Sequence, residues 1–289
     1  MHYEGRIIRP PSEAYSILLQ ATVGCSHNKC TFCGAYKGER FKIKPDAVIQ
    51  ADIDFAAQHC KRQRRLFICD GDALIIPQKR LLQILKSVRA RLPWVTRVGV
   101  YANTKSIRMK TAEELAELQA NGLGIAYMGL ESGDDMTLTA VCKGANAKTM
   151  IETGRKMRQA GIKLSLTVLL GIGGRARSMV HAQETGRVIS AIDPEYVGAL
   201  SLMLIPGTPL YDACREGRFE LLSPEEMLRE LGVMIANTEM SGGLFHANHA
   251  SNYLPLKLTM PRDKAKALDL IDRALKGEIA LKPEAMRAL

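Results

Sequence analysis

The chain has 289 residues, of which 46% are hydrophobic and 24% are charged, and its formal net charge is +10. This composition is typical of a globular protein with an ample core, and no apolar run approaches the roughly 20 residues that cross a bilayer. The opening segment lacks the apolar stretch of a signal peptide because charged residues and a proline interrupt it. We therefore expect a cytoplasmic protein.

Short apolar runs alternate with amphipathic stretches along the chain, as in repeated βα units. The predicted strands are Ser16 to Val23, Arg65 to Cys69, Arg97 to Ala102, Ile125 to Leu130, Lys163 to Leu170 and Tyr196 to Leu204. The predicted helices include 77–92, which has leucine and isoleucine on one face, 111–121 with a capping box, and one that begins at Ser223-Pro224.

Six strands with helical connections predict a parallel sheet covered by helices. The expected fold is α/β, a partial (β/α)6 TIM-like barrel over residues 1–240. Residues 241–289 are expected to be a C-terminal extension packed on the barrel, with an irregular polar segment from Ser241 to Tyr253 followed by a helix over 262–275.

Three cysteines, Cys25, Cys30 and Cys33, lie within nine residues directly after the first predicted strand. Active sites of βα folds lie at this C-terminal end of the strands. Iron–sulfur cubanes take four cysteines as a rule, so three close thiolates would leave one iron open to another ligand. A zinc site made from the same cysteines and His27 is the alternative.

The segment Gly24-Cys-Ser-His-Asn-Lys-Cys-Thr-Phe-Cys33 resembles the cluster motif of the radical S-adenosylmethionine (SAM) superfamily. That motif is C-x₃-C-x₂-C with an aromatic residue before the third cysteine, a position that Phe32 fits. The present sequence has C-x₄-C-x₂-C, one residue more. The resemblance implies a [4Fe–4S] cluster on the three cysteines and SAM as the second cofactor.

Further segments resemble SAM-binding elements of this superfamily in the same order. Phe67-Ile-Cys-Asp-Gly-Asp-Ala73 occupies the place of the element that receives the SAM ammonium group, which implies roles for Asp70, Gly71 and Asp72. The alternative is an ordinary βα turn with capping aspartates.

Three later segments are similar to those of oxygen-independent coproporphyrinogen oxidases, methylthiotransferases and the Elongator catalytic subunit. Gly129-Leu-Glu-Ser implies that Glu131 contacts the SAM ribose, and the arginine before the fifth strand implies that Arg158 binds the SAM carboxylate. Leu170-Gly-Ile-Gly-Gly174 implies that Gly171 and Gly173 lie beside adenine. Each also has a structural explanation, as a helix cap, a helix C-terminus or a turn. Leu204-Ile-Pro-Gly-Thr-Pro-Leu-Tyr211 resembles the Pro-Gly-Thr-Pro-Leu element of these families.

If the resemblance holds, SAM is cleaved to a 5′-deoxyadenosyl radical that abstracts hydrogen from a substrate. A small molecule or peptide is the favoured substrate, and a flavodoxin- or ferredoxin-type protein is the expected reductant. The basic charge keeps an RNA substrate open, and a non-catalytic iron–sulfur or zinc protein is the third hypothesis. In the C-terminal segment, His246, His249 and Tyr253 are weak candidates for catalytic groups, with a well hydrogen-bonded loop as the alternative.

Overall fold

The computed structural model describes residues 1–288, which form two compact units. The first unit contains Met1–Asn28, Ala35–Met128 and Lys156–Leu164, and the second contains Lys29–Gly34, Gly129–Arg155 and the chain from Ser165 onward. The strands are β1 (Ile17–Leu19), β2 (Thr22–Val23), β3 (Lys42–Ile43), β4 (Arg65–Ile68), β5 (Arg97–Ala102), β6 (Leu123–Glu131), β7 (Lys163–Leu170), β8 (Tyr196–Ser201), β9 (Gly243–Ala247) and β10 (Leu256–Met260).

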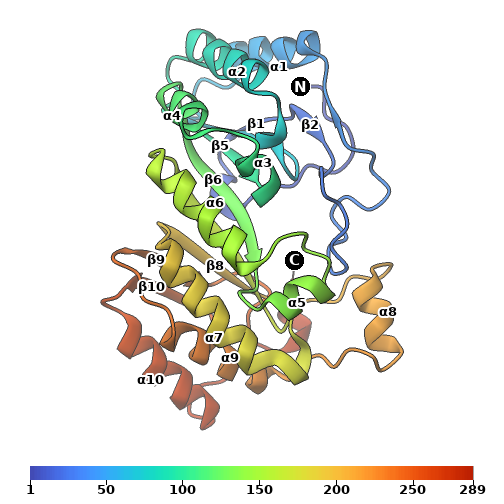
Figure 1. Cartoon of the computed structure of the whole chain (residues 1–289), viewed down its shortest axis with the longest axis vertical. Coiled ribbons are helices and arrows are strands. Elements are labelled where there is room, and N and C mark those ends of the chain that lie inside the picture. Colours follow the sequence, from blue (N-terminus) through green and yellow to red (C-terminus); the bar gives the residue numbers. More distant parts are fainter. Residues whose placement is uncertain (289) are drawn as a thin grey trace. The chain divides into compact units, whose positions relative to one another are not determined.

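Ten α-helices connect or follow these strands within the described residues (Figure 1). They are α1 (Asp46–His59), α2 (Gln78–Arg91), α3 (Thr104–Arg108), α4 (Ala112–Ala120), α5 (Asp135–Ala140), α6 (Ala147–Gln159), α7 (Gly174–Ile192), α8 (Pro209–Arg215), α9 (Pro224–Ala236) and α10 (Lys264–Leu275). Three short 3₁₀ helices are η1 (Pro11–Glu13), η2 (Ala73–Ile75) and η3 (Glu284–Met286).

The main sheet has eight strands in the order β1-β4-β5-β6-β7-β8-β9-β10. The pairs β1/β4, β4/β5, β5/β6, β7/β8 and β8/β9 are parallel, and β9/β10 is antiparallel. The prediction of an α/β fold built on a parallel sheet is therefore confirmed. Because parallel strands end at the same edge, the turns after β4 and β5 meet in the first unit, as do those after β7, β8 and β9 in the second.

The first unit has an aromatic centre between its strands. The ring of Phe67 on β4 meets those of Tyr101 on β5 and Tyr127 on β6 edge to face, with centroids 5.1 and 5.7 Å away. Helix α2 buries Leu81, Ile84, Leu85 and Val88, the face that the sequence predicts. The capping box at Thr111 and Glu114 is also confirmed at the start of α4. Local sequence signals thus set the helices of this unit.

In the second unit, α7 packs on α9, and α9 packs on α10 (Figure 1). Ser223 caps α9 with Glu226, and Pro224 is the first helical residue, as predicted. The helix predicted over 262–275 is α10. Strand residues such as Leu166, Val197 and Phe245 are buried, so this unit has its own apolar core.

Two parts of the chain differ from the sequence prediction. The strand predicted over Ser16 to Val23 is divided into β1 and β2, and β2 pairs with β3 in a separate antiparallel ribbon. The break occurs at Gln20, whose side chain bonds the backbone of Glu4. The segment predicted as irregular between Ser241 and Tyr253 contains β9, because five of its residues pair with β10 and three with β8.

No helix within residues 1–288 is both long and apolar enough to span a membrane.

Candidate active site

The three clustered cysteines are divided between the two units. Cys25 belongs to the first unit, and Cys30 and Cys33 belong to the second. All three side chains are partly exposed, as is His27 between them. Within residues 1–288, no three or more Cys, His, Asp or Glu side chains are arranged as ligands of one metal ion. The ligand assignment therefore stays a prediction from the motif.

The second half of the cysteine loop is anchored in the second unit. The N–H of Thr31 donates to the carbonyl of Val141, and the Thr31 carbonyl accepts from the N–H of Leu210, both at 3.0 Å. Phe32 packs against the apolar cluster that includes Val141 and Leu210. Leu210 closes the Pro-Gly-Thr-Pro-Leu segment, so this segment supports the loop that carries Cys30 and Cys33.

Cys25 in the first unit lies against the turn that follows β4. Its Sγ is 4.0 Å from the carbonyl oxygen of Gly71, and the N–H of Gly71 donates to the carbonyl of Gly24 at 3.1 Å. A β carbon at Gly71 would lie 2.7 Å from that of Cys25 and 2.9 Å from the ring of Tyr36. Only glycine fits here, so the Asp-Gly-Asp turn and the first cysteine are packed as one element.

Asp72 carries a buried carboxylate that is only half satisfied. Its Oδ2 accepts hydrogen bonds from Ser26 at 2.5 Å and from Asn103 at 2.8 Å. Its Oδ1 is buried and makes no hydrogen bond of ordinary geometry, although the Ser106 hydroxyl and the Asn103 N–H lie near the carboxylate and favour its charged form. Burial raises the pKa of Asp72 to about 6, against the hydrogen bonds that favour the charged form. A buried oxygen of this kind suits a cationic donor such as an ammonium group.

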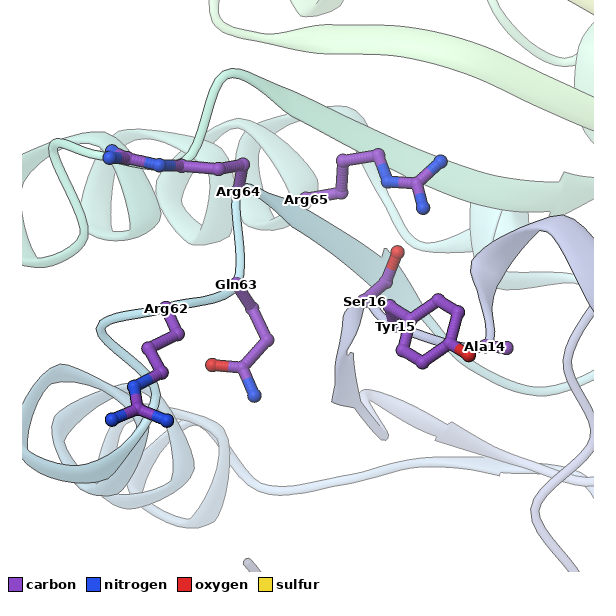
Figure 2. Close-up of a pocket in the computed structure, with 7 residues that line it drawn as sticks. All are labelled: Ala14, Tyr15, Ser16, Arg62, Gln63, Arg64 and Arg65. Carbon is purple, nitrogen blue, oxygen red and sulfur yellow. The ribbon is translucent and has the colours of Figure 1, made fainter.

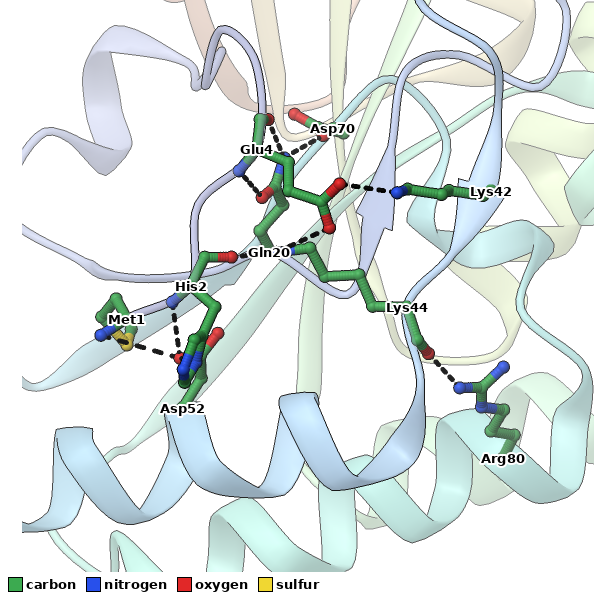
Figure 3. Close-up of polar contacts among 9 residues, drawn as sticks. All are labelled: Met1, His2, Glu4, Gln20, Lys42, Lys44, Asp52, Asp70 and Arg80. Atoms are coloured by element: carbon green, nitrogen blue, oxygen red, sulfur yellow. Dashed lines mark hydrogen bonds and ion pairs between the residues drawn. The ribbon is translucent and has the colours of Figure 1, made fainter.

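Asp70 is held differently, by side chains of the same unit (Figure 3). Gln20 Nε2 donates to Asp70 Oδ2 at 2.8 Å and to the carbonyl of Glu4 at 2.8 Å, and Gln20 Oε1 accepts from the N–H of Glu4. Tyr36 donates to Asp70 Oδ1 at 3.5 Å. Burial raises the pKa of Asp70 to about 6 although these donors act against it. Both Asp70 oxygens are engaged, so Asp72 is the better acceptor for a ligand.

Glu131 is the centre of a tight turn at the end of β6. Its φ is 61°, and the N–H of Ser132 donates to the carbonyl of Leu130 at 2.7 Å, which closes a three-residue turn. Such a backbone costs about 1–3 kcal/mol for a residue with a side chain. The Glu131 carboxylate forms an ion pair with Lys143 at 3.1 Å. Strain of this kind is characteristic of ligand-binding turns.

The remaining predicted SAM contacts lie at element ends. Gly171 directly follows β7 with φ 82°, and its N–H donates to Glu230 Oε1 at 2.6 Å. Gly173 is the residue before α7 and has ordinary helical φ, so only Gly171 needs the left-handed conformation of glycine. Arg158 lies in the last turn of α6, in the first unit, and is partly exposed.

The C-terminal candidates share the second unit but have different surroundings. Burial lowers the pKa of His246 and of His249, with Lys257 and Lys282 adding to the respective shifts, so both imidazoles favour the neutral form. His246 lies within β9, and His249 bonds Ser251 at 2.9 Å.

Tyr253 is enclosed by the C-terminal turn. Its hydroxyl donates to Glu284 at 2.5 Å and accepts from Arg287 at 2.6 Å, and burial together with Glu284 raises the pKa of Tyr253 to about 12. Arg287 also bonds the carbonyls of Ser251 and Leu202. The Tyr253 hydroxyl is therefore engaged within a hydrogen-bonded turn.

Several polar residues beside the predicted site were not singled out from the sequence. They are Gln20, Ser26, Tyr36, Asn103, Lys143, His181 and Glu230. Asn103 directly follows β5, and its side chain both caps α3 and bonds Asp72. Its position at a strand end was a usable signal. Ser26 lies within the cysteine segment and Gln20 within the first predicted strand, but each bonds a residue far away in the sequence, as the others do, so spacing along the chain gives no hint of the contact.

Residues 19–182 match the model of the radical SAM superfamily, which covers more than half of the chain. The chain therefore belongs to the radical SAM superfamily, whose members use a [4Fe–4S] cluster and SAM. It is 22% identical over 226 residues to the uncharacterized protein MJ0486 of Methanocaldococcus jannaschii, with 74% of this chain and 69% of that protein aligned. It is 23% identical to the uncharacterized protein YtqA of Bacillus subtilis over 71% and 64% of the two chains.

Solved structures share the fold at low identity. Coproporphyrinogen III oxidase HemN from Escherichia coli has a TM-score of 0.56 at 16% identity, covering 76% of this chain and 51% of its own. Methylornithine synthase PylB has a TM-score of 0.54 at 16% identity, with 78% and 63% covered. The methyltransferase TsrM from Kitasatospora setae reaches 0.59 at 17%, with 83% and 54% covered. The chain thus spans about half to two thirds of these structures.

The residues present suit the cofactors of the superfamily. Three partly exposed thiols are the soft ligands that iron–sulfur clusters take. The Asp72 Oδ1, which makes no hydrogen bond of ordinary geometry, can accept from an ammonium donor, and Gly71 leaves no space for a side chain beside Cys25. These features support cofactor binding by this chain without reference to the spacing of the cysteine motif.

Proposed function

We propose that Cys25, Cys30 and Cys33 hold the [4Fe–4S] cluster in a C-x₄-C-x₂-C variant of the superfamily motif. Three thiolates leave one iron for the amino and carboxylate groups of SAM. When both are bound and one electron is supplied, SAM yields methionine and a 5′-deoxyadenosyl radical, which becomes 5′-deoxyadenosine on taking a hydrogen atom from the substrate. The chain's own part is to bind and orient these groups and to exclude water.

Asp72 is the proposed acceptor for the SAM ammonium group, with the backbone of Asp70 and Gly71 beside it. The observation that carries this proposal is the buried Oδ1 of Asp72, which makes no hydrogen bond of ordinary geometry, on the turn packed against Cys25. An ammonium donor would satisfy that oxygen and favour its charged form. The opposing explanation, an ordinary capping aspartate, does not account for it, because the Asp72 side chain caps no helix.

We assign the rest of SAM to the other predicted contacts. Glu131 would accept from the ribose hydroxyls, Arg158 would bind the carboxylate, and Gly171 and Gly173 would allow close approach of adenine. The strained turn at Glu131 and the left-handed Gly171 support this assignment. The subgroup with coproporphyrinogen oxidases, methylthiotransferases and the Elongator catalytic subunit remains our proposal, as does a division into a barrel of residues 1–240 and an extension of 241–289.

The proposed substrate is a small molecule or peptide, with a flavodoxin- or ferredoxin-type protein as the electron donor and the cytoplasm as the location. His246 and His249 are the proposed groups for proton transfer, since burial keeps their imidazoles neutral and able to accept a proton. Tyr253 ranks below them because its hydroxyl is already bonded on both sides.

An RNA substrate is the second candidate, and a basic hollow in the first unit supports it. The hollow has a volume of 430 Å³ and is lined by Ala14, Tyr15, Ser16, Arg62, Gln63, Arg64 and Arg65. Figure 2 shows the side chains of Arg64 and Arg65 pointing in opposite directions, which suits an extended polyanion better than one small anion. Arg65 begins β4, however, so the hollow lies at the end of the strand away from Asp72.

The deciding experiment is anaerobic. The chain is reconstituted with iron and sulfide, given SAM and dithionite, and assayed for 5′-deoxyadenosine by mass spectrometry, with Cys30→Ala as the test variant and Cys214→Ala as the matched control. Deoxyadenosine from the wild type and Cys214→Ala, but not from Cys30→Ala, is expected. Bound zinc in place of iron, or a full cluster that does not bind SAM, would support the non-catalytic alternative.

A further inference from the structure

Two proposed SAM-binding turns of the second unit share an unusual backbone. Glu131 ends β6 with φ 61°, and Gly171 follows β7 with φ 82°. Neither turn is held by sheet hydrogen bonds alone, because each is joined to a buried side chain from a helix. These two side chains are Glu230 on α9 and His181 on α7, both 0% exposed. The two helices pack side by side (Figure 1).

Glu230 holds the turn after β7. Its Oε1 accepts from the N–H of Gly171 at 2.6 Å, and its Oε2 accepts from the hydroxyl of Ser178 at 2.5 Å. A backbone N–H bonded to a carboxylate is a strong, charge-assisted contact. The position of Gly171 therefore depends on where α9 places this carboxylate.

His181 holds the turn at Glu131. Its Nδ1 lies 2.8 Å from Ser132 Oγ and 3.3 Å from Thr185 Oγ1. Ser132 Oγ already accepts from the N–H of Asp134, and Thr185 Oγ1 from the N–H of Gly133. The Ser132 hydroxyl has its proton free for Nδ1, and the direction of this bond depends on the imidazole tautomer. Ser132 directly follows Glu131 and supplies the N–H that closes its turn.

These contacts also assign the imidazole tautomer. We assign the ring proton of a neutral imidazole to Nε2, because an N–H there faces the Glu230 carboxylate and leaves Nδ1 to accept from Ser132. Nε2 lies 3.4 Å from Glu230 Oε1, within ion-pair distance, but makes no hydrogen bond of ordinary geometry within residues 1–288. The positive edge of His181 therefore faces the carboxylate that holds Gly171, which links the two turns through one buried pair.

We propose that His181 and Glu230 act as a positioning pair that fixes the Glu131 and Gly171 turns together for SAM binding. The part of this proposal that concerns SAM rests on the proposed function. The coupling between the two turns does not depend on it. Both residues act through the turns that they hold. A buried carboxylate and a buried imidazole are costly when left alone, so the loss of either partner disturbs both turns.

The coupling can be tested in the cofactor-free chain by amide hydrogen exchange and mass spectrometry. The variants are His181→Ala, Glu230→Ala and the double variant, with Ser132→Ala as a milder change. Thr238→Val is the matched control, because Thr238 is buried just beyond α9 and its hydroxyl donates to the carbonyl of Met234. Each single variant should speed exchange about tenfold in both 129–134 and 170–173. Faster exchange in only the turn next to the mutated residue would overturn the coupling.

The role in SAM binding is measured with the anaerobically reconstituted chain by equilibrium dialysis of labelled SAM. Each single variant should raise the SAM Kd about tenfold. The double variant should have a Kd no higher than that of the single variant that binds SAM less tightly, because the His181–Glu230 pair is already lost in each single variant. Thr238→Val should leave the Kd unchanged. An unchanged Kd in variants whose turns have loosened, or fully additive effects, would refute the pair.

The two proposals fail in different ways. If the wild type carries a full cluster but binds no SAM, the proposed function fails, whereas the exchange data still decide whether the pair couples the turns. If the wild type binds SAM and the variants bind it equally well, only the positioning pair fails. If both alanine variants fail to fold, hydrogen exchange and the SAM Kd are measured on Ser132→Ala and Glu230→Gln instead. Glu230→Gln keeps an acceptor for the Gly171 N–H.

Discussion

The carboxylate of Glu131 folds back over Gly129, where a β carbon would lie 2.1 Å from Oε1. The same β carbon would lie 2.8 Å from Lys143 Nζ, the partner of that carboxylate. The glycine of the Gly-Leu-Glu-Ser segment is therefore required by the side chain two residues later. The Glu131–Lys143 ion pair occupies the space that a side chain at residue 129 would fill.

Gly129→Ala should separate ligand binding from stability. The added methyl meets only the flexible ends of Glu131 and Lys143, so the free energy of unfolding should change by about 1 kcal/mol or less. The displaced carboxylate should weaken SAM binding about tenfold. Gly198→Ala is the matched control, since its β carbon would have no neighbour closer than 3.9 Å. Equal SAM affinity of Gly129→Ala and wild type would remove Glu131 from the proposed site.

Gly71→Ala should act on the cluster rather than on SAM alone. Its β carbon would lie 2.7 Å from the Cys25 β carbon and 3.2 Å from its α carbon, so the backbone of the first cysteine has to move. We expect lower iron and sulfide content per chain after anaerobic reconstitution, measured by metal analysis. Gly242→Ala, where nothing lies within 4 Å, serves as control. Full iron content in Gly71→Ala would argue against Cys25 as a ligand.

The Asp134–Arg177 pair should give the second unit a dependence on pH. Burial opposes ionisation of Asp134, but hydrogen bonds from Arg177 at 2.7 and 2.8 Å and from Thr137 outweigh it and hold the pKa of Asp134 well below its usual range. A carboxyl whose pKa is lowered by folding stabilises the protein above its unfolded pKa of about 3.9, and this contribution is lost as pH falls through the folded pKa.

Asp134→Asn should therefore unfold at a lower temperature than the wild type at pH 7. The difference should shrink as pH falls below about 4, because the carboxyl of the unfolded wild-type chain then becomes protonated, and it should vanish only below the lower pKa of the folded carboxyl. Thermal unfolding followed by circular dichroism at a series of pH values measures it. A difference that is the same at pH 7 and at the lowest pH would mean that the variant acts through altered hydrogen bonding around residue 134 and not through the charge.

The sequence predicts the elements whose signals are local. The apolar face of α2, the capping boxes of α4 and α9, and the six parallel strands follow from patterns within one segment. The order of turns after these strands also places Asp72 and Gly171 at strand ends, where the structure has them. What holds those turns is not local, since Glu230 is 59 residues from Gly171 and Gln20 is 50 residues from Asp70.

The same reason explains the two errors in the fold. The first strand is divided because the backbone changes partner at Gln20, from β4 before it to β3 after it, and no pattern within Ser16 to Val23 contains either partner. The polar composition of the segment around His246 hides β9, whose pairing partners on β8 and β10 supply its hydrogen bonds. Strand pairing at a sheet edge depends on neighbours more than on intrinsic preference.

The basic hollow around Arg62, Arg64 and Arg65 allows a last test of the substrate class. None of the three forms an ion pair within residues 1–288, whereas Arg97 on the next strand is neutralised by Glu13. Because the hollow is at the N-terminal end of β4, an Arg62→Ser/Arg64→Ser variant should form deoxyadenosine at the wild-type rate, within about twofold.

RNA binding, by contrast, would depend on these charges. For a single-stranded RNA, the slope of log affinity against log salt should become shallower by about 1.4 when two phosphate contacts are lost, because fewer counterions are released. Filter binding over a salt series measures this slope for the wild type and the double variant. We expect the wild type to bind RNA weakly and RNA not to stimulate the formation of deoxyadenosine, as the proposal of a small-molecule or peptide substrate requires. Stimulation by RNA that the double variant loses would instead make the hollow part of an RNA-modifying enzyme.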